Sequence, residues 1–526
     1  MIRLKTVFGL SLCVLCVLGG ELVSAPPTLT SLFPAGGAVG QTVEFTASGS
    51  FDKWPVTAWA SDPNVALTPG KDKGKFTATI APGAKPGPVW IRLHDASGAS
   101  PLRPFVLGVL PEIAEAEPND DVAKAQTVER SCVVNGKLGR SGDVDVFAIQ
   151  LAKGQTLVAS LLANHVLRSP MDAVLQVVSP DGFVLDQNHD HRGLDPQLAF
   201  TAPKDGAYRV RIFAFPSQPD SSIRHFGSDL CVYRLTLSTA GYEDIPIPLA
   251  IQNGSGAKPK ATGWNLAIAP IVPSAVAVRE EAFACHDFTA AKPTTALVPP
   301  FAVTGRIAEP GAVNAIPVKL TKSKPIAVQI ESRALELPLT PVLRLLDESG
   351  AVLARAEPAR PNADCELNYA PTKDQTATLE VRDLYRAGGE RFIYRVRVVH
   401  PEPDADLTVA ADRFALAPGT PLEIPVTVAR KAGFKGVLEL KAEGLPPDVT
   451  ATSEPGKDDK TLTLKLSTEA KAISKPFRIV AVAKDNAAFT RPVRAALAEF
   501  ETTTSDLWLT VGSDAKVAPP TPKKKK

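Results

Sequence analysis

Short apolar runs separated by proline, glycine and polar turns recur along the whole chain. Typical runs are VWIRLHD at 89–95, VFAIQL at 146–151 and TLTLKLS at 461–467, all rich in Val, Leu and Ile. Short runs of this kind, bounded by turn residues, are typical of strands in β-sandwiches. Helical candidates such as DVAKAQTV at 121–128 are brief. The pattern therefore predicts an all-β chain built from tandem β-sandwich domains.

The composition agrees with this interpretation and narrows the range of partners. The 526 residues include 48 Pro and 36 Gly, which interrupt the chain throughout. A chain of this length predicts several domains rather than one core. The formal net charge is only +2, so the sequence carries no footprint of nucleic-acid binding. The final APPTPKKKK predicts a disordered basic tail.

The first 25 residues have the organisation of a secretory signal. Arg3 and Lys5 precede the apolar stretch VFGLSLCVLCVLGG, and small residues follow up to Ala25. We therefore expect a protein that is secreted or held in the periplasm or cell envelope. A proline follows Ala25, so either removal of the signal or its retention as an anchor fits the sequence. The apolar stretch is too short for a membrane span, and we expect no transmembrane span after signal removal.

An internal repeat is the most informative feature of the sequence. Residues 133–151 align without a gap with residues 302–320, and the match continues from 169–185 to 337–353. We therefore expect two copies of one β-domain. Copy one lies near residues 112–238 and copy two near residues 299–400.

Six cysteines bear on the compartment and on the fold. Cys13 and Cys16 fall inside the signal, so their CxxC spacing is not a redox or metal motif. In an oxidising compartment the remaining four are expected to form two disulfides. These four are Cys132, Cys231, Cys285 and Cys365.

The repeat predicts how these cysteines pair. Cys132 aligns with Phe301 and Cys231 with Phe392, so both thiols are replaced together by the same residue type. We therefore expect the two thiols of copy one to be neighbours on its first and last strands and to form a disulfide. Two unrelated buried thiols are the alternative. The remaining pair, by elimination, is Cys285 and Cys365.

Acidic residues gather at the start of copy one, in AEAEPNDD at 114–121 and GDVDVF at 142–147. Residues two apart on a strand share a face, so Asp143 and Asp145 stand on the side of the apolar Phe147. Unpaired charges beside an apolar face are costly, and Ca²⁺, which accepts about six to eight oxygen ligands, removes that cost. A solvated acidic loop followed by a turn Asp is the alternative. The candidate ligands are Glu115, Glu117, Asn119, Asp120, Asp121, Asp143 and Asp145.

Copy two lacks this acidic set. Asp143 and Asp145 become Ala312 and Asn314, and no similar acidic run precedes the copy. The acidic run and the Asp pair are thus present together in copy one and absent together from copy two. We therefore expect one or two calcium ions in copy one and no metal in copy two.

Four motifs of copy one, EPNDD, GDVDVF, DAVLQVVSPDG and FTAPKDGAYRVRI, together resemble the bacterial pre-peptidase C-terminal domain. The resemblance covers copy one well and copy two more weakly. It implies a compact β-sandwich of the kind found beside the catalytic domains of secreted proteases and in many exported multidomain proteins. In calcium-binding members the metal lies between the linker before the first strand and the strand with the Asp pair. Carried over, this implies as ligands Glu117, Asn119, Asp120, Asp143 and Asp145, with Glu115 and Asp121 as additions.

Other segments resemble immunoglobulin-like modules of exported bacterial proteins. Residues 32–99 resemble an IPT/TIG-type sandwich, residues 256–270 a truncated relative and residues 416–451 an Ig-like domain. We therefore expect jelly-roll-like and Ig-like sandwiches in tandem, arranged as a beaded rod or closed by contacts between copies. The predicted division is a signal peptide over 1–25, an Ig/TIG-like sandwich over 26–110, a pre-peptidase-like sandwich with the calcium site over 111–240, a short TIG-like or linker segment over 241–298, a second, degenerate pre-peptidase-like sandwich over 299–402, an Ig-like sandwich over 403–513 and a basic tail over 514–526.

The sequence carries no enzyme signature. The motifs GxSxG and HExxH and any subtilase-like run are absent. His189 and His191 in NHDHRG, with Asp186 or Asp190, have the residue types of a transition-metal site, and a polar loop is the alternative. We expect a non-catalytic exported protein that binds or adheres to a polymer, a cell-surface component or a partner protein. The alternative function is an ancillary or processing subunit of a secreted protease, or a hydrolase itself.

Overall fold

The computed structural model describes residues 24–512 and residue 515, except for residues 220, 222, 223, 292, 457 and 471. Residues 1–23 of the predicted signal, with Cys13 and Cys16, lie outside the described residues, as does nearly all of the predicted tail. Within the described part, helices are limited to one four-residue α-helix and three 3-10 turns, so the all-β prediction is confirmed. No helix in that part is long and apolar enough to cross a membrane.

The first sandwich consists of strands β1–β9 and packs two sheets, in the orders β1-β3-β6-β5 and β2-β9-β7-β4. Three aromatic rings occupy its core, with Phe45 centred 5.5 Å from Phe76 and 5.4 Å from Phe105. The strands are β1 (Ser31–Phe33), β2 (Gly36–Ala38), β3 (Thr42–Ser48), β4 (Thr57–Ala60), β5 (Val65–Pro69), β6 (Lys75–Ile80), β7 (Gly87–Asp95), β8 (Gly98–Ala99) and β9 (Arg103–Gly108).

The second sandwich, β10–β19, packs the sheet β10-β12-β19-β14-β17 against the sheet β11-β13-β18-β15-β16. As the alternation of β13 predicts, Phe147, Ile149 and Leu151 are all buried in its core. The elements are β10 (Glu112–Ala114), η1 (Val122–Lys124), β11 (Gln126–Val128), β12 (Cys132–Lys137), β13 (Asp145–Leu151), β14 (Thr156–Leu162), α1 (Asn164–Leu167), β15 (Met171–Val178), β16 (Val184–Asn188), β17 (Gln197–Thr201), β18 (Gly206–Pro216) and β19 (Val232–Ser238).

A connector of four strands joins the second sandwich to the third. Its strands pair as β20 with β22 and β21 with β23, and its Ile245 and Leu249 pack against Leu337 and Ile393 of the third sandwich. The connector strands are β20 (Tyr242–Ile247), β21 (Ala250–Gln252), β22 (Lys260–Trp264) and β23 (Arg279–Glu281).

The third sandwich, β24–β32, repeats the strand order of the second, except that its facing sheet has no strand equivalent to β11. Its sheet β24-β25-β32-β27-β30 has the same strand order as β10-β12-β19-β14-β17, and the facing sheet runs β26-β31-β28-β29. The elements are β24 (Ala284–Phe288), β25 (Phe301–Arg306), β26 (Val313–Leu320), β27 (Ile326–Glu331), η2 (Arg333–Leu335), β28 (Pro341–Leu346), β29 (Val352–Ala356), β30 (Glu366–Tyr369), β31 (Gln375–Asp383) and β32 (Ile393–Val399).

The fourth sandwich, β33–β42, forms one hydrogen-bonded path in the order β34-β42-β39-β40-β33-β35-β38-β37, to which β36 and β41 add. Its elements are β33 (Asp404–Val409), β34 (Arg413–Leu416), β35 (Leu422–Lys431), β36 (Leu438–Glu443), β37 (Val449–Pro455), β38 (Thr461–Thr468), β39 (Ile473–Ala483), β40 (Thr490–Leu497), η3 (Ala498–Phe500), β41 (Thr502–Thr504) and β42 (Leu507–Val511).

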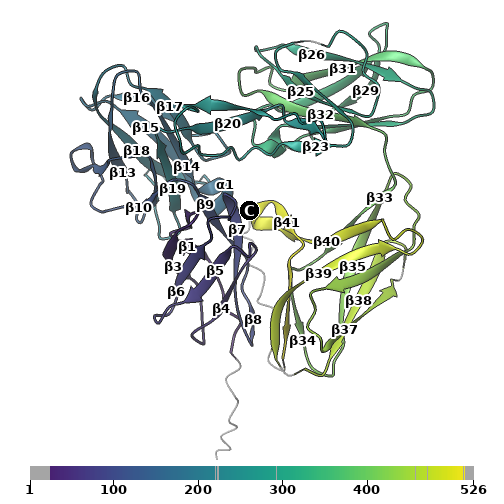
Figure 1. Ribbon diagram of the computed structural model, residues 1–526, viewed down its shortest axis with the longest axis horizontal. Coiled ribbons are helices and arrows are strands. Elements are labelled where there is room, and N and C mark those ends of the chain that lie inside the picture. Colours follow the sequence, from purple (N-terminus) through teal and green to yellow (C-terminus); the bar gives the residue numbers. More distant parts are fainter. Residues whose placement is uncertain are drawn as a thin grey trace, which may run out of the picture.

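The chain closes on itself, because the fourth sandwich packs against the first (Figure 1). The fully buried Arg92 guanidinium lies 2.6 Å from the Asp412 carboxylate, and the indole rings of Trp59 and Trp508 are centred 5.8 Å apart. The second and third sandwiches also touch, through a 2.8 Å contact between His165 Nε2 and a Glu336 carboxylate oxygen. The sequence is compatible with a beaded rod or with an arrangement closed by contacts between domains, and the structure shows the closed arrangement.

The predicted disulfides are absent, because all four cysteines of the described residues are free. Strands β12 and β19 do pair, but their register places Cys132 opposite Leu237, six residues from Cys231. At the rise of a strand this separates the thiols by about 20 Å, far beyond disulfide reach. The prediction that Cys132 and Cys231 are neighbours is therefore wrong, because the two thiols lie at opposite ends of the β12–β19 strand pair. Cys285 on β24 and Cys365 beside β30 likewise lie at opposite edges of one sheet.

Candidate metal centre

The acidic segment crosses between the two sheets of the second sandwich. Strand β10 runs parallel to β12 in one sheet, and β11 runs parallel to β13 in the other, so residues 115–125 span one end of the sandwich. Backbone hydrogen bonds hold the crossing at both sides. Glu115 N donates to Asn135 O at 2.9 Å, and Val146 N donates to Asn119 O at 3.1 Å. The loop is therefore fixed beside the start of β13, which begins at Asp145.

Three carboxylates converge at this end of the sandwich. Ligand oxygens of Glu115, Glu117 and Asp145 all lie within 4.8 Å of one another. Asp145 is fully buried and Glu115 is half-buried, whereas Glu117 is exposed. We call these three residues and Asn119 the acidic cluster. Like charges at such distances repel unless protons or a cation lie between them.

The buried side-chain amide of Asn119 adjoins two of these carboxylates. Asn119 is fully buried, and its side-chain oxygen faces Glu117 Oε2 at 3.0 Å and Asp145 Oδ1 at 3.3 Å. Turning the amide by 180° converts both contacts into N–H···O hydrogen bonds. The turned orientation satisfies both carboxylates, so the Asn119 amide acts as a hydrogen-bond donor to Glu117 and Asp145.

Burial dominates the electrostatics of the acidic cluster. Burial, together with the hydrogen bond and charge of Glu115, raises the pKa of Asp145 to about 10. Burial also raises the pKa of Glu115. Metal-free protein at neutral pH therefore retains a proton on this pair of carboxyl groups. A divalent cation supplies positive charge in place of that proton, which is the usual coupling between metal binding and proton release.

A tyrosine that sequence reasoning missed completes the surroundings of Asp145. The buried hydroxyl of Tyr233, on β19 of the opposite sheet, donates to Asp145 Oδ2 at 2.6 Å. The aligned Tyr394 of the third sandwich contacts Asn314 Nδ2 at 3.0 Å, at the position that corresponds to Asp145. The signal that would have indicated this role was the presence of Tyr in both copies, in VYRL and IYRV.

Asp143 lies beside the acidic cluster but faces another way. It is almost completely buried, and its Oδ2 accepts a hydrogen bond from Gly139 N at 2.5 Å. Its Oδ1 has no hydrogen-bond partner among the described residues and lies 3.6 Å from Arg140 Nε. The Asp143 charge contributes to the raised pKa of Asp145.

Asp120 and Asp121 have local roles within the crossing segment. Asp120 Oδ1 accepts a hydrogen bond from the exposed Arg140 guanidinium at 2.7 Å. Asp121 Oδ1 caps the short turn η1 by accepting from Ala123 N at 2.7 Å. Of the seven candidate ligands, the structure therefore brings together Glu115, Glu117, Asn119 and Asp145, and it turns the other three elsewhere.

The two histidines of NHDHRG do not share a site. His189 Nδ1 lies 2.9 Å from Asp190 Oδ2 at the surface. His191 is turned the other way, with its Nδ1 3.5 Å from an Arg391 guanidinium nitrogen of the third sandwich. Burial lowers the pKa of His191 to about 3, so this ring is neutral at physiological pH. The polar-loop interpretation fits this geometry.

Comparison with known proteins places a family match on the second sandwich. No curated protein matches the chain. Among solved structures, the pre-peptidase C-terminal domain of a collagenase from Bacillus anthracis is 13% identical, covers 24% of this chain and 100% of that chain, and has a TM-score of 0.18. Fibronectin(III)-like modules of CbhA from Clostridium thermocellum are 10% identical, cover 37% of this chain and 87% of that chain, and have a TM-score of 0.13. Residues 143–214, which include Asp143 and Asp145, match the family model of the bacterial pre-peptidase C-terminal domain.

Proposed function

We propose that this chain is an exported, non-catalytic binding protein of tandem β-sandwiches, and that its second sandwich holds calcium. The observation that carries the calcium assignment is the convergence of three carboxylates, those of Glu115, Glu117 and Asp145, at one end of that sandwich. Carboxylates and amide oxygens are the ligands that Ca²⁺ prefers. The family match over residues 143–214 supports a module that is typically non-catalytic.

Calcium at this position would tie the two sheets together. Glu115 follows β10 of one sheet, and Asp145 begins β13 of the other. A shared cation replaces repulsion between these carboxylates by attraction and adds a cross-link at the end of the core. The ion therefore has a structural role: it orders the crossing segment beside the first sandwich and adds no chemistry of its own.

A binding measurement tests the calcium assignment directly. Protein freed of metal with EGTA is titrated with CaCl₂ in a calorimeter, and we expect saturable binding of one or two ions, with proton release. Glu115→Gln is expected to weaken binding strongly, because it removes a charge from the acidic cluster. Asp120→Asn is the matched control, since that carboxylate pairs with Arg140 outside the cluster. Absence of binding heat in the unmodified protein would rule the site out.

We also assign the remaining sandwiches on their folds and sequence motifs. The third sandwich has the strand order of the second and is interpreted as its degenerate copy. The first and fourth are interpreted as IPT/TIG-like and Ig-like modules. With the signal segment, this composition favours a protein of the secreted or cell-envelope fraction that binds a polymer, a cell-surface component or a partner protein.

The family match also favours a second function, that of an ancillary subunit of a secreted protease. Affinity purification of the tagged chain from the exported fraction separates the two. Repeated recovery of one protease in constant ratio supports the subunit. Retention on a cell-wall polysaccharide or on collagen, without any protease, supports the binding protein.

A further inference from the structure

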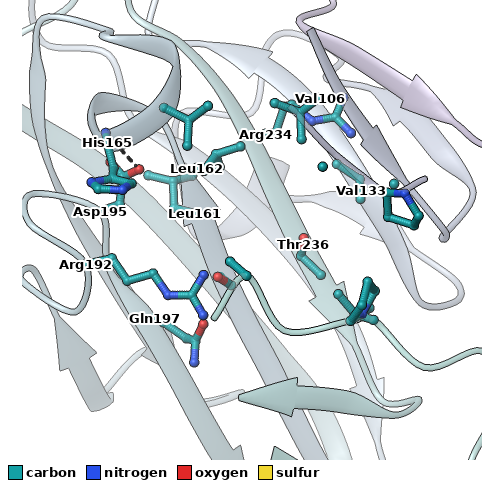
Figure 2. Close-up of a pocket in the computed structure, with 18 of the residues that line it drawn as sticks. Val106, Val133, Leu161, Leu162, His165, Arg192, Asp195, Gln197, Arg234 and Thr236 are labelled. Carbon is teal, nitrogen blue, oxygen red and sulfur yellow. Dashed lines mark hydrogen bonds between the residues drawn. The ribbon is translucent and has the colours of Figure 1, made fainter. Parts of the chain in front are cut away.

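A cavity of about 410 Å³ lies where four parts of the chain meet (Figure 2). The first sandwich contributes Val106, the second contributes Thr236, the connector contributes Tyr242 and the third sandwich contributes Glu336. Cavities of roughly 300 to 1,000 Å³ at domain junctions commonly bind small ligands. No residue of the acidic cluster lines this cavity, so it is separate from the proposed calcium site.

The lining of the cavity combines apolar and polar side chains. Val106, Val133 and Leu161 belong to the apolar lining. Figure 2 shows the side chains of Arg192 and Gln197 next to each other, on the far side of the cavity from Val106 and Val133. An apolar body with a few polar groups at fixed positions is the ligand that such a lining recognises.

The charged groups that line the cavity have partners within the protein. They are Arg192, Arg234, Asp195 and Glu336, with His165 in contact with Glu336. Arg234 is paired with Glu112 at 2.7 Å, and the Asp195 carboxylate accepts three backbone N–H groups at the start of α1. A further net charge would meet no free counter-charge here. The lining therefore favours an uncharged ligand.

Three buried side-chain nitrogen atoms of this lining lack hydrogen-bond partners among the described residues. Among the described residues, Arg192 Nε, Gln197 Nε2 and His191 Nε2 are buried without a hydrogen bond. Gln197 is only 5% exposed, and its amide oxygen already accepts from the Tyr242 hydroxyl at 2.8 Å. Buried donors without acceptors are costly, so a bound group that offers acceptor oxygens would gain their hydrogen bonds.

A hydroxyl group that lies beside the Arg192 and Glu336 side chains can contact both of them. Arg192 Nε and Glu336 Oε2 are 3.8 Å apart, which is too long for a hydrogen bond. The other oxygen of Glu336 is engaged by His165 at 2.8 Å. A hydroxyl both donates and accepts, so one hydroxyl can accept from Arg192 while donating to Glu336. A second hydroxyl, on a neighbouring carbon, can accept from the Gln197 amide.

We propose that this inter-domain cavity binds a small uncharged polyol, of the size of a single sugar residue. Its hydroxyl groups bridge Arg192, Glu336 and Gln197, and its C–H face packs on the valine and leucine wall. Because residues of the second and third sandwiches both contact the ligand, binding also links these two sandwiches.

Calorimetric titration of the full chain tests the proposal with named probes. Glucose, galactose, mannose and N-acetylglucosamine represent the proposed class, glucuronate represents a charged polyol and octanoate an apolar anion. We expect one of the neutral sugars to bind at one site per chain, with glucuronate and octanoate at least tenfold weaker. Arg192→Met, which removes the donors, and Thr236→Trp, which fills the cavity, are each expected to weaken binding at least tenfold.

Two control variants keep the result interpretable. Arg209→Met removes another arginine of the second sandwich whose Nε lacks a partner but which does not line the cavity, and it is expected to leave affinity unchanged. Asp145→Asn is likewise expected to bind the sugar normally, which separates this site from the calcium proposal. Circular dichroism and thermal unfolding verify that each variant folds. No binding of any neutral sugar, tighter binding of glucuronate or octanoate, or equal affinity in Thr236→Trp would overturn the proposal.

Discussion

The second and third sandwiches share one topology yet differ at one end. In both, the hydroxyl of a buried tyrosine contacts the start of a strand in the facing sheet. Tyr233 of β19 contacts Asp145 of β13, and Tyr394 of β32 contacts Asn314 of β26. In both, one aspartate accepts three backbone N–H groups at the start of a short helical turn. The bonds run from residues 163–165 to Asp195 and from residues 332–334 to Asp364. The fold is thus preserved in detail.

The second and third sandwiches differ in residue types at the position of the acidic cluster. Asn314 stands in place of Asp145, and it donates to Tyr394 Oη and to Arg306 O at 3.0 Å each. By the parallel register of β24 with β25, Phe288 stands where Glu115 stands in the second sandwich. Phe288 packs against the core of the third sandwich. A ring and an amide therefore fill the space that carboxylates occupy in the second sandwich, which shows that this fold does not itself need the acidic cluster.

The largest expected effect comes from giving the second sandwich the residue of the third. In Asp145→Asn we expect calcium to lose its stabilising effect, which at a hundredfold excess over Kd is about 2.7 kcal/mol. Without calcium the variant is expected to be at least as stable as the unmodified protein, because a buried carboxyl group is removed. Hydrogen exchange of peptides from β13, with and without calcium, measures the effect locally. A calcium response of unchanged size would contradict the assigned ligands.

The reciprocal exchange, Asn314→Asp, is expected to destabilise the third sandwich by about 1–2 kcal/mol at neutral pH. An ionised Asp cannot donate to Arg306 O, so a hydrogen bond is lost and two acceptors face each other. We expect no calcium response, because Phe288 offers no ligand. Hydrogen exchange of peptides from β26 gives the local stability, and peptides from β13 are the internal control. Gain of calcium protection in the third sandwich would show that one carboxylate suffices.

The sequence predicted the shared topology of the two sandwiches better than it predicted the side-chain contacts within each of them. The gapless alignment anticipated the shared strand order, and the parity of Asp145 with Phe147 anticipated a carboxylate on the core side of β13. Alignment carries no information on cross-strand register, so it placed Cys132 and Cys231 together although the register of β12 with β19 separates them. Residue types likewise could not show which acids of one loop turn inward.

The packing of the fourth sandwich against the first could not be predicted from the sequence, for a different reason. Arg92 and Asp412 are separated by 320 positions, and nothing local distinguishes them from other charged residues on strands. Their pairing depends on the angles between four sandwiches, which follow from the connector and from packing at each junction. The cavity proposed to bind a polyol is a product of the same closure, since three sandwiches and the connector line it.

A smaller effect is expected at the contact between the second and third sandwiches. The hydrogen bond with Glu336 raises the pKa of His165, and although burial opposes it, the His165 contact lowers the pKa of Glu336. The raised pKa of His165 stabilises the folded state below about pH 6.5 and that gain is lost as pH rises through the folded value. The lowered pKa of Glu336 contributes above about pH 4.5 and is lost as pH falls through its folded value. The contact is therefore strongest between these limits.

His165→Gln tests this contact while keeping a hydrogen-bonding side chain. Since both partners are partly exposed, we expect a difference in unfolding free energy of at most about 1 kcal/mol, largest near pH 5.5 and smaller at pH 8. Thermal unfolding across this pH range provides the measurement, and His189→Gln, at a surface position that does not reach the third sandwich, is the control. A difference that is independent of pH would show that the charge of His165 does not contribute.

The smallest expected effect concerns the thiols, whose aligned positions in the third sandwich hold phenylalanines. Because the register separates Cys132 from Cys231, a reducing agent is expected to leave thermal unfolding unchanged. A disulfide closing a loop of this length would instead contribute about 4 to 5 kcal/mol, and its reduction would be plain. Alkylation of the unfolded, unreduced protein followed by peptide mapping should modify every one of the four cysteines. Recovery of a peptide linking Cys132 to Cys231 would mean that the pairing of β12 with β19 differs from the one described.

In the third sandwich, Phe301 and Phe392 lie at opposite ends of the β25–β32 strand pair, as the two cysteines do on β12 and β19. Both sandwiches therefore use these two positions to fill separate ends of the core.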